Sequence, residues 1–322
     1  MKTQPEFDAD DLNLVSLAQE YSDEDKAREL LEQMFWPNGA VCPHCKNDGK
    51  TKPNSKMTPK PDSKHPIRKG VYFCGACRKL FSVTVGTIFE RSHVPINKWL
   101  LAWFIMSSSK KSVSAHQLHR MLKVTYKTAW FMCHRIRFGV GADLQTAKPL
   151  DNVCEADETF VNTGKQTSKF KRSKFATVAL VLERDGEART RVIPSVTMRN
   201  VGKFLNETVS KKAVVNTDEH ASYTYILKPY KRHERVNHSK YEYARKNPNG
   251  TMSHINTCES FFSLVKRGMY GAFHCVSREH LPKYMNEFEY RWNTRKLTDG
   301  ARMAAGIPMT QGKRLMYRQP VN

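Results

Sequence analysis

Two pairs of cysteines have the spacing of a metal site. Cys42 and Cys45 enclose Pro-His, and Cys74 and Cys77 enclose Gly-Ala. Each CxxC turn presents two thiolates on one side of a tight knuckle, and two knuckles complete a tetrahedral shell of four sulfurs, which suits Zn²⁺. Four sulfurs leave no open coordination position, so the pattern predicts a structural zinc ion. A redox role is disfavoured, because neither pair stands in the strand-to-helix context of redox motifs.

Acidic residues occur at three places that a fold could bring together. Asp157 lies in an expected strand, Asp218 ends another strand, and Glu259 lies on an expected amphipathic helix. At 100° per residue, Asn256, Glu259 and Lys266 share the polar face of that helix. Three like charges repel unless a cation neutralises them, and oxygen ligands with a phosphate substrate favour Mg²⁺ or Mn²⁺. Two such ions about 4 Å apart can activate a water or a 3′-hydroxyl and stabilise the leaving oxygen.

The segment that precedes this helix has an order of elements that would position Asp157 and Asp218. The expected elements are a strand at 153–161, a basic loop at 164–174, strands at 175–183 and 188–196, a helix at about 199–210 and a buried strand at 213–219. Three antiparallel strands, a helix and then a parallel strand are the order of the ribonuclease-H-like fold. In that α/β arrangement, a mixed sheet with flanking helices, the two aspartates meet at one edge of the sheet.

Other polar residues near these acids have weaker claims to a site. Glu155 and Asp157 point to the same side of their strand and Glu158 to the other, so Glu155 is a lesser candidate for metal contact. Four residues are expected at the surface or in hydrogen bonds: Glu219, His220, His254 and His274. Three residues that end a later amphipathic helix would either bind phosphate or cap that helix: Arg291, Asn293 and Arg295.

A basic helical segment lies between the cysteines and the acids. Pro95 is expected to open one helix, and Ser114 and Thr125 are expected to cap two short helices joined at residues 123–124. Two such helices predict a helix-turn-helix, whose second helix would contact DNA. Its available polar residues are Tyr126 and His134 with the predicted DNA contacts Lys127, Arg135 and Arg137. The alternative is a plain helical bundle with a solvated basic face.

Charge supports a polyanionic partner. The 322 residues include 53 Lys and Arg against 31 Asp and Glu, a net charge of +22. Residues 1–32 differ, with ten acidic and three basic residues. No run approaches the ~18 apolar residues of a membrane span, and the acidic start lacks the features of a signal peptide. We therefore expect a cytoplasmic, nucleoid-associated protein without a membrane partner.

Two polar, basic stretches interrupt the expected elements. Residues 46–70 have too little apolar content to fold alone and are expected as an exposed loop between the two knuckles. Residues 228–249 interleave aromatic residues with Lys and Arg. They are expected to separate two structured pieces and can touch nucleic acid.

Together these motifs resemble the insertion-sequence DDE transposases of family 1595, also called ISXO-like, with eukaryotic Merlin elements as relatives. The resemblance runs from the ribbon and its exit CRKLFSVTVGTIFE through ADETFV and NTDEHASY to HINTCESFFSLVKRGMYGAFHC. It implies that Asp157 and Asp218 are the first two metal ligands. The family has Asn or Glu at the third catalytic position, followed by Lys. Glu259 is favoured here for its charge and its seven-residue spacing to Lys266, and Asn256 is kept as the alternative ligand or a neighbour of the site.

The resemblance implies a DNA transposase that binds the terminal inverted repeats of its element, cleaves their 3′ ends and joins them to target DNA, as a homo-oligomer on double-stranded DNA. Two alternatives stay open: a nuclease of the same fold that does not join, and a domesticated DNA-binding regulator without chemistry. The expected organisation is an acidic helical segment at 1–35, a zinc ribbon at 36–90, a helix-turn-helix at 91–145, a ribonuclease-H-like catalytic domain at 146–300 and a tail at 301–322.

Overall fold

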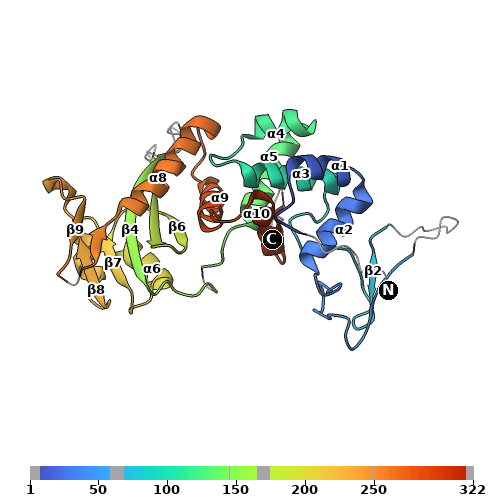
Figure 1. Cartoon of the computed structure of the whole chain (residues 1–322), viewed down its shortest axis with the longest axis horizontal. Helices are drawn as coiled ribbons and strands as arrows, with labels where there is room; N and C mark the ends of the chain where they lie inside the picture. The colour runs from blue at the N-terminus through green and yellow to red at the C-terminus, as the bar shows by residue number, and fades with distance from the viewer. Residues whose placement is uncertain (1–7, 59–68, 145, 165–174, 249, 317–322) are drawn as a thin grey trace, which may run out of the picture. The chain divides into compact units, whose positions relative to one another are not determined.

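The computed structural model divides the chain into two compact units (Figure 1). It describes residues 8–58, 69–144, 146–164, 175–248 and 250–316, so most of the basic loop expected at 164–174 lies outside the described residues. The first unit contains residues 1–140 together with 297–322, and the second contains residues 141–296. Each unit is described by itself below.

A three-stranded antiparallel ribbon surrounds the cysteines of the first unit. Its strands, in the order β1-β2-β3, are β1 (Asn54–Lys56), β2 (Tyr72–Cys74) and β3 (Leu80–Phe81). β1 lies within the stretch that was expected to be a loop, because it pairs with β2 across the knuckles. β3 ends at Phe81, and turn hydrogen bonds such as Val85 N to Ser82 O (3.1 Å) follow it.

Helices make up the rest of the first unit. They are α1 (Leu14–Glu20), α2 (Glu24–Phe35), α3 (Ile96–Ser108), α4 (Ala115–Leu122), α5 (Tyr126–Gly139) and α10 (Asp299–Gly306). The predicted caps form: the hydroxyls of Ser114 and Thr125 each accept a bond of 3.1 Å from a backbone N–H of the first turn. Lys123 ends α4 in the left-handed region, at φ 50°. None of the described helices is long and apolar enough to cross a bilayer.

The acidic N-terminal segment neutralises part of the ribbon. Glu32 of α2 accepts hydrogen bonds from the Tyr72 hydroxyl (2.7 Å) and from Lys56 Nζ (3.1 Å). Asp25 of the same helix pairs with Lys69. At least two of the N-terminal acids, Asp25 and Glu32, therefore have basic partners within the first unit.

A five-stranded mixed sheet forms the second unit. The strands, in the order β6-β5-β4-β7-β8, are β4 (Val153–Asn162), β5 (Phe175–Glu183), β6 (Ala188–Ile193), β7 (Val214–Thr217) and β8 (Arg232–Arg235). β4 is antiparallel to β5 and parallel to β7, and α6 (Met198–Thr208) connects β6 to β7. The predicted ribonuclease-H-like order is confirmed. The stretch at 228–249 is more than a separator, because it supplies β8 and the hairpin strand β9 (Ala244–Lys246), which pairs with β10 (Met252–His254).

Helices cover both faces of this sheet. Residues 176, 178, 180 and 182 of β5 pack with α8 (Asn256–Gly268) and α9 (Leu281–Asn293) in one apolar cluster. Residues 179 and 181, with Cys154 and Ala156 of β4, pack with α6 and α7 (Ala221–Ile226) in another. Alternation along the strands therefore decides which helix each side chain meets.

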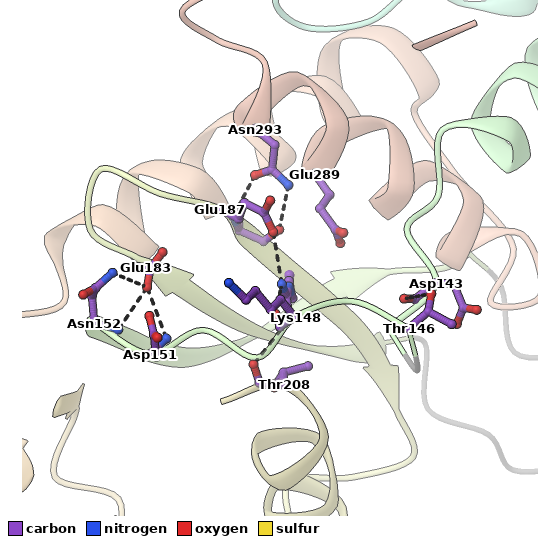
Figure 2. A network of polar contacts seen from close by, with 12 residues as sticks. Asp143, Thr146, Lys148, Asp151, Asn152, Glu183, Glu187, Thr208, Glu289 and Asn293 are labelled. Atoms are coloured by element: carbon purple, nitrogen blue, oxygen red, sulfur yellow. Dashed lines mark hydrogen bonds and ion pairs between the residues drawn. The ribbon is translucent and has the colours of Figure 1, made fainter. Parts of the chain in front are cut away.

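The end of α9 seals the edge strand β6. The Asn293 side chain accepts a hydrogen bond from Ala188 N (2.7 Å) and donates one to Ala188 O (3.1 Å). Glu289, one turn earlier, accepts from Thr190 N (2.9 Å) and Oγ1 (3.0 Å). Figure 2 shows both side chains together with Glu187, which directly precedes β6. Asn293 thus pairs with the backbone of the edge strand, which is neither phosphate binding nor helix capping.

Candidate active site and zinc site

The two CxxC knuckles meet at one point. The Sγ atoms of Cys42 and Cys77 are 3.7 Å apart, and those of Cys45 and Cys74 are 3.6 Å apart. Zn–S bonds of about 2.3 Å in a tetrahedron place the sulfurs about 3.8 Å apart, so the spacing fits a zinc ion. The backbone N–H of Cys77 points at the Cys74 sulfur and lowers the pKa of that thiol to about 6, toward the thiolate form that binds metal.

Asp157 lies on the face of β4 that meets α8. Glu155 and Asp157 share this face, as alternation predicted. Glu158 faces the other side, where its Oε1 accepts a hydrogen bond of 2.6 Å from the hydroxyl of buried Tyr223 on α7. The sheet therefore directs Asp157, and not Glu158, toward the helix that carries Glu259.

Asp218 follows directly after β7, the neighbour of β4. Glu155 is paired with Asn216 in the parallel register of these two strands. Continuing the register by two residues brings Asp218 beside Asp157, about 4.8 Å away between strand axes. The next residue, Glu219, accepts hydrogen bonds from Ser239 and from the backbone of residues 238 and 239, which lower its pKa to about 2. These bonds fix the loop that carries Asp218.

A cavity of 660 Å³ extends from Asp157 along α8. Its walls contain Asp157, Glu158, Thr159, Glu259, Phe262, Ser263, Lys266, Arg267 and Tyr270. Glu259 and Lys266 therefore lie on the same wall, seven residues apart on one helix. Asn256, one turn before Glu259, is exposed and is not among the residues of this wall. The cavity has an acidic end and a basic, aromatic end.

The acidic end of the cavity is electrostatically unbalanced. Burial raises the pKa of Asp157 to about 7, and the negative charges of Glu158, Asp218 and Glu259 raise it further. The hydrogen bond that Asp157 accepts from the backbone N–H of Glu158 acts to lower this pKa. Burial likewise raises the pKa of Glu158 to about 7. Oxygen donors that repel one another in this way fit a hard divalent cation. Among the described residues, however, the four cysteines form the only group of three or more potential metal ligands whose ligand atoms lie within 4.8 Å of one another. The three carboxylates do not form such a group.

The contacts of two residues near the acids, His238 and Glu155, were not predicted from the sequence. The Nδ1 atom of His238 lies 3.7 Å from Glu259 Oε1, and the backbone N–H of the same residue donates to Glu219. His238 thus links the loop after β7 to α8. Glu155 is completely buried and bonds to the start of α8. Neither role is visible in the sequence, because each depends on a contact between distant segments.

The predicted helix-turn-helix forms, but not all its basic residues face outward. Lys127, near the start of α5, is exposed. Arg135 and Arg137 are only 7% and 2% exposed, and His134 is also buried. Arg135 donates to the carbonyls of Ile88 (2.7 Å) and of residue 315 (3.2 Å), and burial lowers its pKa. The prediction that Arg135 and Arg137 contact DNA does not fit this burial.

Comparison with known proteins gives two family matches. Residues 149–293 match the ISXO2-like transposase domain, and residues 22–80 match the transposase zinc-ribbon domain. A protein of Halobacterium salinarum, described as an uncharacterized protein in transposable element ISH50, is 28% identical over 288 residues, which are 83% of this chain and 90% of that protein. The first match contains all three acids and Lys266, and the second contains the four cysteines of the structural zinc site.

Proposed function

Because the chain belongs to the IS1595 family of DDE transposases, with both its zinc-ribbon and its transposase domain, we propose that it cuts the 3′ ends of its own element and joins them to target DNA. The observation that carries this proposal is the cavity on which Asp157, Glu259 and Lys266 lie together, beside the strand end that carries Asp218. A transposase of this type is a polynucleotidyl transferase.

The three carboxylates would hold Mg²⁺ or Mn²⁺. Bound in this way, divalent ions activate the attacking oxygen and stabilise the leaving oxygen of an in-line phosphoryl displacement. In cleavage, water attacks the phosphorus and the 3′-oxygen of the element end leaves. In joining, that 3′-hydroxyl attacks a target phosphate and a target 3′-oxygen leaves. The high pKa of Asp157 supports this role, because a cation there would relieve the repulsion of its neighbours.

The basic end of the cavity would hold the DNA backbone. Lys266 and Arg267 follow Glu259 on the same helix, and both line the cavity. Their charges would bind the phosphates next to the scissile bond and hold the strand against the carboxylates. Lys266 therefore acts in positioning, while the metal ligands carry the displacement.

The first unit would recognise the element ends. In this proposal the zinc ribbon at 36–90 and the helix-turn-helix at 91–145 bind the inverted repeats, and residues 146–300 carry the chemistry. Lys127 is the DNA contact that remains from the sequence prediction, joined by exposed Arg120 and Lys123 at the turn between the two helices. Pairing of two element ends calls for a homo-oligomer on DNA, in the nucleoid.

One assay tests the proposal. The purified full-length protein is incubated with duplexes that carry the ends of its element, a target plasmid and Mg²⁺, and the products are searched for 3′-end cleavage and strand transfer. Asp157→Asn is the control, because it keeps the shape of the side chain and removes its charge. Cleavage without joined products would indicate the nuclease alternative. End-specific binding without any cleavage in Mg²⁺ or Mn²⁺ would indicate the regulator.

A further inference from the structure

A buried carboxylate outside the proposed metal site lies only two residues from Asp157. Glu155 is on the same face of β4 and is 0% exposed. Burial of a charged group costs free energy unless the group is paired and hydrogen-bonded. The contacts of Glu155 therefore indicate what its charge does.

Glu155 caps α8 from another element. The residue before this helix, Ile255, offers no side-chain cap, so the first backbone N–H groups need another acceptor. Glu155 Oε2 accepts from the backbone N–H groups of Thr257 (2.9 Å) and Cys258 (3.2 Å), and Oε1 accepts from the Thr257 hydroxyl (2.9 Å). A negative charge at a helix N-terminus also interacts favourably with the helix dipole.

A cation completes the surroundings of this carboxylate. Arg184, just after β5, donates from Nε to Glu155 Oε1 at 2.8 Å. Its other nitrogens donate to the carbonyls of Met252 (2.6 Å) and His254 (3.0 Å), in the strand that leads into α8. His254 Nδ1 lies 3.1 Å from Glu155 Oε1. Among the described residues, these partners of Glu155 belong to the start of α8 or hold the chain before it.

We infer that Glu155 is a positioning residue that sets the distance between Asp157 and Glu259. Asp157 lies two positions after Glu155, about 7 Å along β4. Its partners Thr257 and Cys258 directly precede Glu259. The same carboxylate therefore joins the strand that carries one proposed metal ligand to the helical turn that carries another. Metal sites work only when their ligands are held to within about 0.5 Å, and such a link supplies that constraint.

This inference rests on the proposed function, because it assigns a role toward the proposed metal ions. Glu155→Gln keeps the volume of the side chain but replaces one acceptor oxygen by a donor. The amide NH₂ would face either the backbone N–H groups of α8 or the donors of Arg184 and Thr257, and neither arrangement satisfies both sides. The start of α8 would shift, and Glu259 would move with it. The loss of a partner that orients metal ligands typically weakens metal binding about 10- to 100-fold.

The test measures Mn²⁺ binding to the zinc-loaded, full-length protein by electron paramagnetic resonance, together with cleavage rates and end binding. Glu155→Gln is expected to raise the Kd for Mn²⁺ at least about 10-fold, to slow cleavage at low Mn²⁺ and to regain much of the rate at high Mn²⁺. End binding by the variant should match that of the wild type. Unchanged Mn²⁺ affinity would overturn the inference.

Glu289→Gln is the matched control. Glu289 is also a buried carboxylate of the second unit, but it bonds to Thr190 of β6 and not to α8. It should lower the unfolding temperature and leave Mn²⁺ affinity within about 2-fold of the wild type. An equal loss of Mn²⁺ affinity in both variants would reduce Glu155 to a general structural residue.

Two further variants keep the outcome interpretable. Should Glu155→Gln fail to fold, Thr257→Val removes one hydroxyl donor to the same carboxylate and should raise the Mn²⁺ Kd about 2- to 3-fold; an unchanged Kd would again count against the inference. Asp157→Asn separates the two levels of the argument. If Asp157→Asn binds Mn²⁺ like the wild type, the proposed metal site is wrong. If it loses binding while Glu155→Gln does not, only the positioning role fails.

Discussion

The zinc site and the proposed carboxylate site of this chain are built in opposite ways. The four thiols converge on one point, with sulfur pairs 3.6 and 3.7 Å apart, whereas the three carboxylates do not come within 4.8 Å of one another as a group. Each CxxC turn fixes two thiols by local backbone geometry. The carboxylates come from two strands and a helix, and they repel. The zinc site is therefore defined by sequence spacing, and the proposed carboxylate site by tertiary contacts and by the cation that it would bind.

The largest effect is expected at the thiols. Cys42→Ser combined with Cys77→Ser removes one ligand from each knuckle, and structural zinc sites contribute about 10 kcal/mol or more to folding. Zinc, measured by elemental analysis, should fall from one ion per chain to none. Residues 40–85 should then lose protection from proteolysis, and end-specific DNA binding should be lost. One zinc ion per chain in the double variant would contradict the four-sulfur site.

The carboxylate site should lose chemistry without losing structure. Asp157→Asn and Asp218→Asn each remove a charged ligand and keep the side-chain shape, so cleavage should fall at least about 10³-fold, about 4 kcal/mol in activation free energy. Zinc content and DNA binding should stay unchanged, in contrast to the cysteine variants. The measurement is single-turnover cleavage of an end duplex in Mg²⁺. Retained strand transfer in both variants would place the active site elsewhere.

A third substitution pair decides between the two candidates on α8. Glu259 lines the cavity and Asn256 does not, so Glu259→Gln should match Asp157→Asn in severity, while Asn256→Ala should slow cleavage less than about 10-fold. The opposite order would make Asn256 the third ligand. Lys266→Ala should slow cleavage and weaken the positioning of the end, with Mn²⁺ affinity unchanged.

Glu289 is a buried carboxylate for which no metal is proposed, and it can be compared with the carboxylates of the proposed metal site. Burial raises the pKa of Glu289 to about 7. The hydrogen bonds from Thr190 and the positive charge of Arg189 act to lower this pKa, and the negative charge of Glu187 acts to raise it. The unfolded value is near 4.5, so the folded protein binds more protons between these two pH values. The free energy of unfolding should therefore fall by about 3 kcal/mol as the pH rises from about 4.5 to 7.

Urea unfolding at several pH values measures this slope, and Glu289→Gln serves as the comparison. The variant should lack this part of the pH dependence, and added Mg²⁺ should leave the part due to Glu289 unchanged, since no metal is proposed there. Parallel pH profiles for the wild type and the variant would show that Glu289 does not titrate in this range.

Sequence patterns predicted the structural features that depend on the period of apolar residues and on the spacing of motifs. The strands at 153–161 and 175–183, the caps at Ser114 and Thr125 and the four-sulfur cluster all follow from local signals, and the structure confirms them. β8 could not be predicted, because all four of its residues, Arg232–Arg235, are polar and only the parallel pairing with β7 makes them a strand.

The contacts of buried polar residues were also not predicted from the sequence. Arg135 reads as a surface residue of a basic helix, but its guanidinium bonds to carbonyls of segments that are distant in the sequence. Glu155 likewise reads as a spare acid beside Asp157, until α8 packs onto β4. In both cases the partners lie on distant segments and include backbone groups, which leave no pattern in the sequence. The strands and the helix that carry the three acids were predicted correctly, but the contacts that hold these elements together were not.

The smallest expected effect is on α5, where one basic residue is predicted to contact DNA and another to stabilise the fold. Lys127 is exposed near the start of this helix, whereas Arg135 is buried. Lys127→Ala should weaken end binding by about 1 kcal/mol and reduce the salt dependence of binding by about one phosphate contact, with the cleavage rate at saturating DNA unchanged. Arg135→Ala should instead lower the unfolding temperature, because it leaves the carbonyl of Ile88 without its donor. Binding isotherms at several salt concentrations and thermal unfolding of both variants distinguish these outcomes. If Arg135→Ala keeps the wild-type unfolding temperature and reduces the salt slope, its side chain reaches DNA in solution, and the packing of α5 must open for the ends to bind.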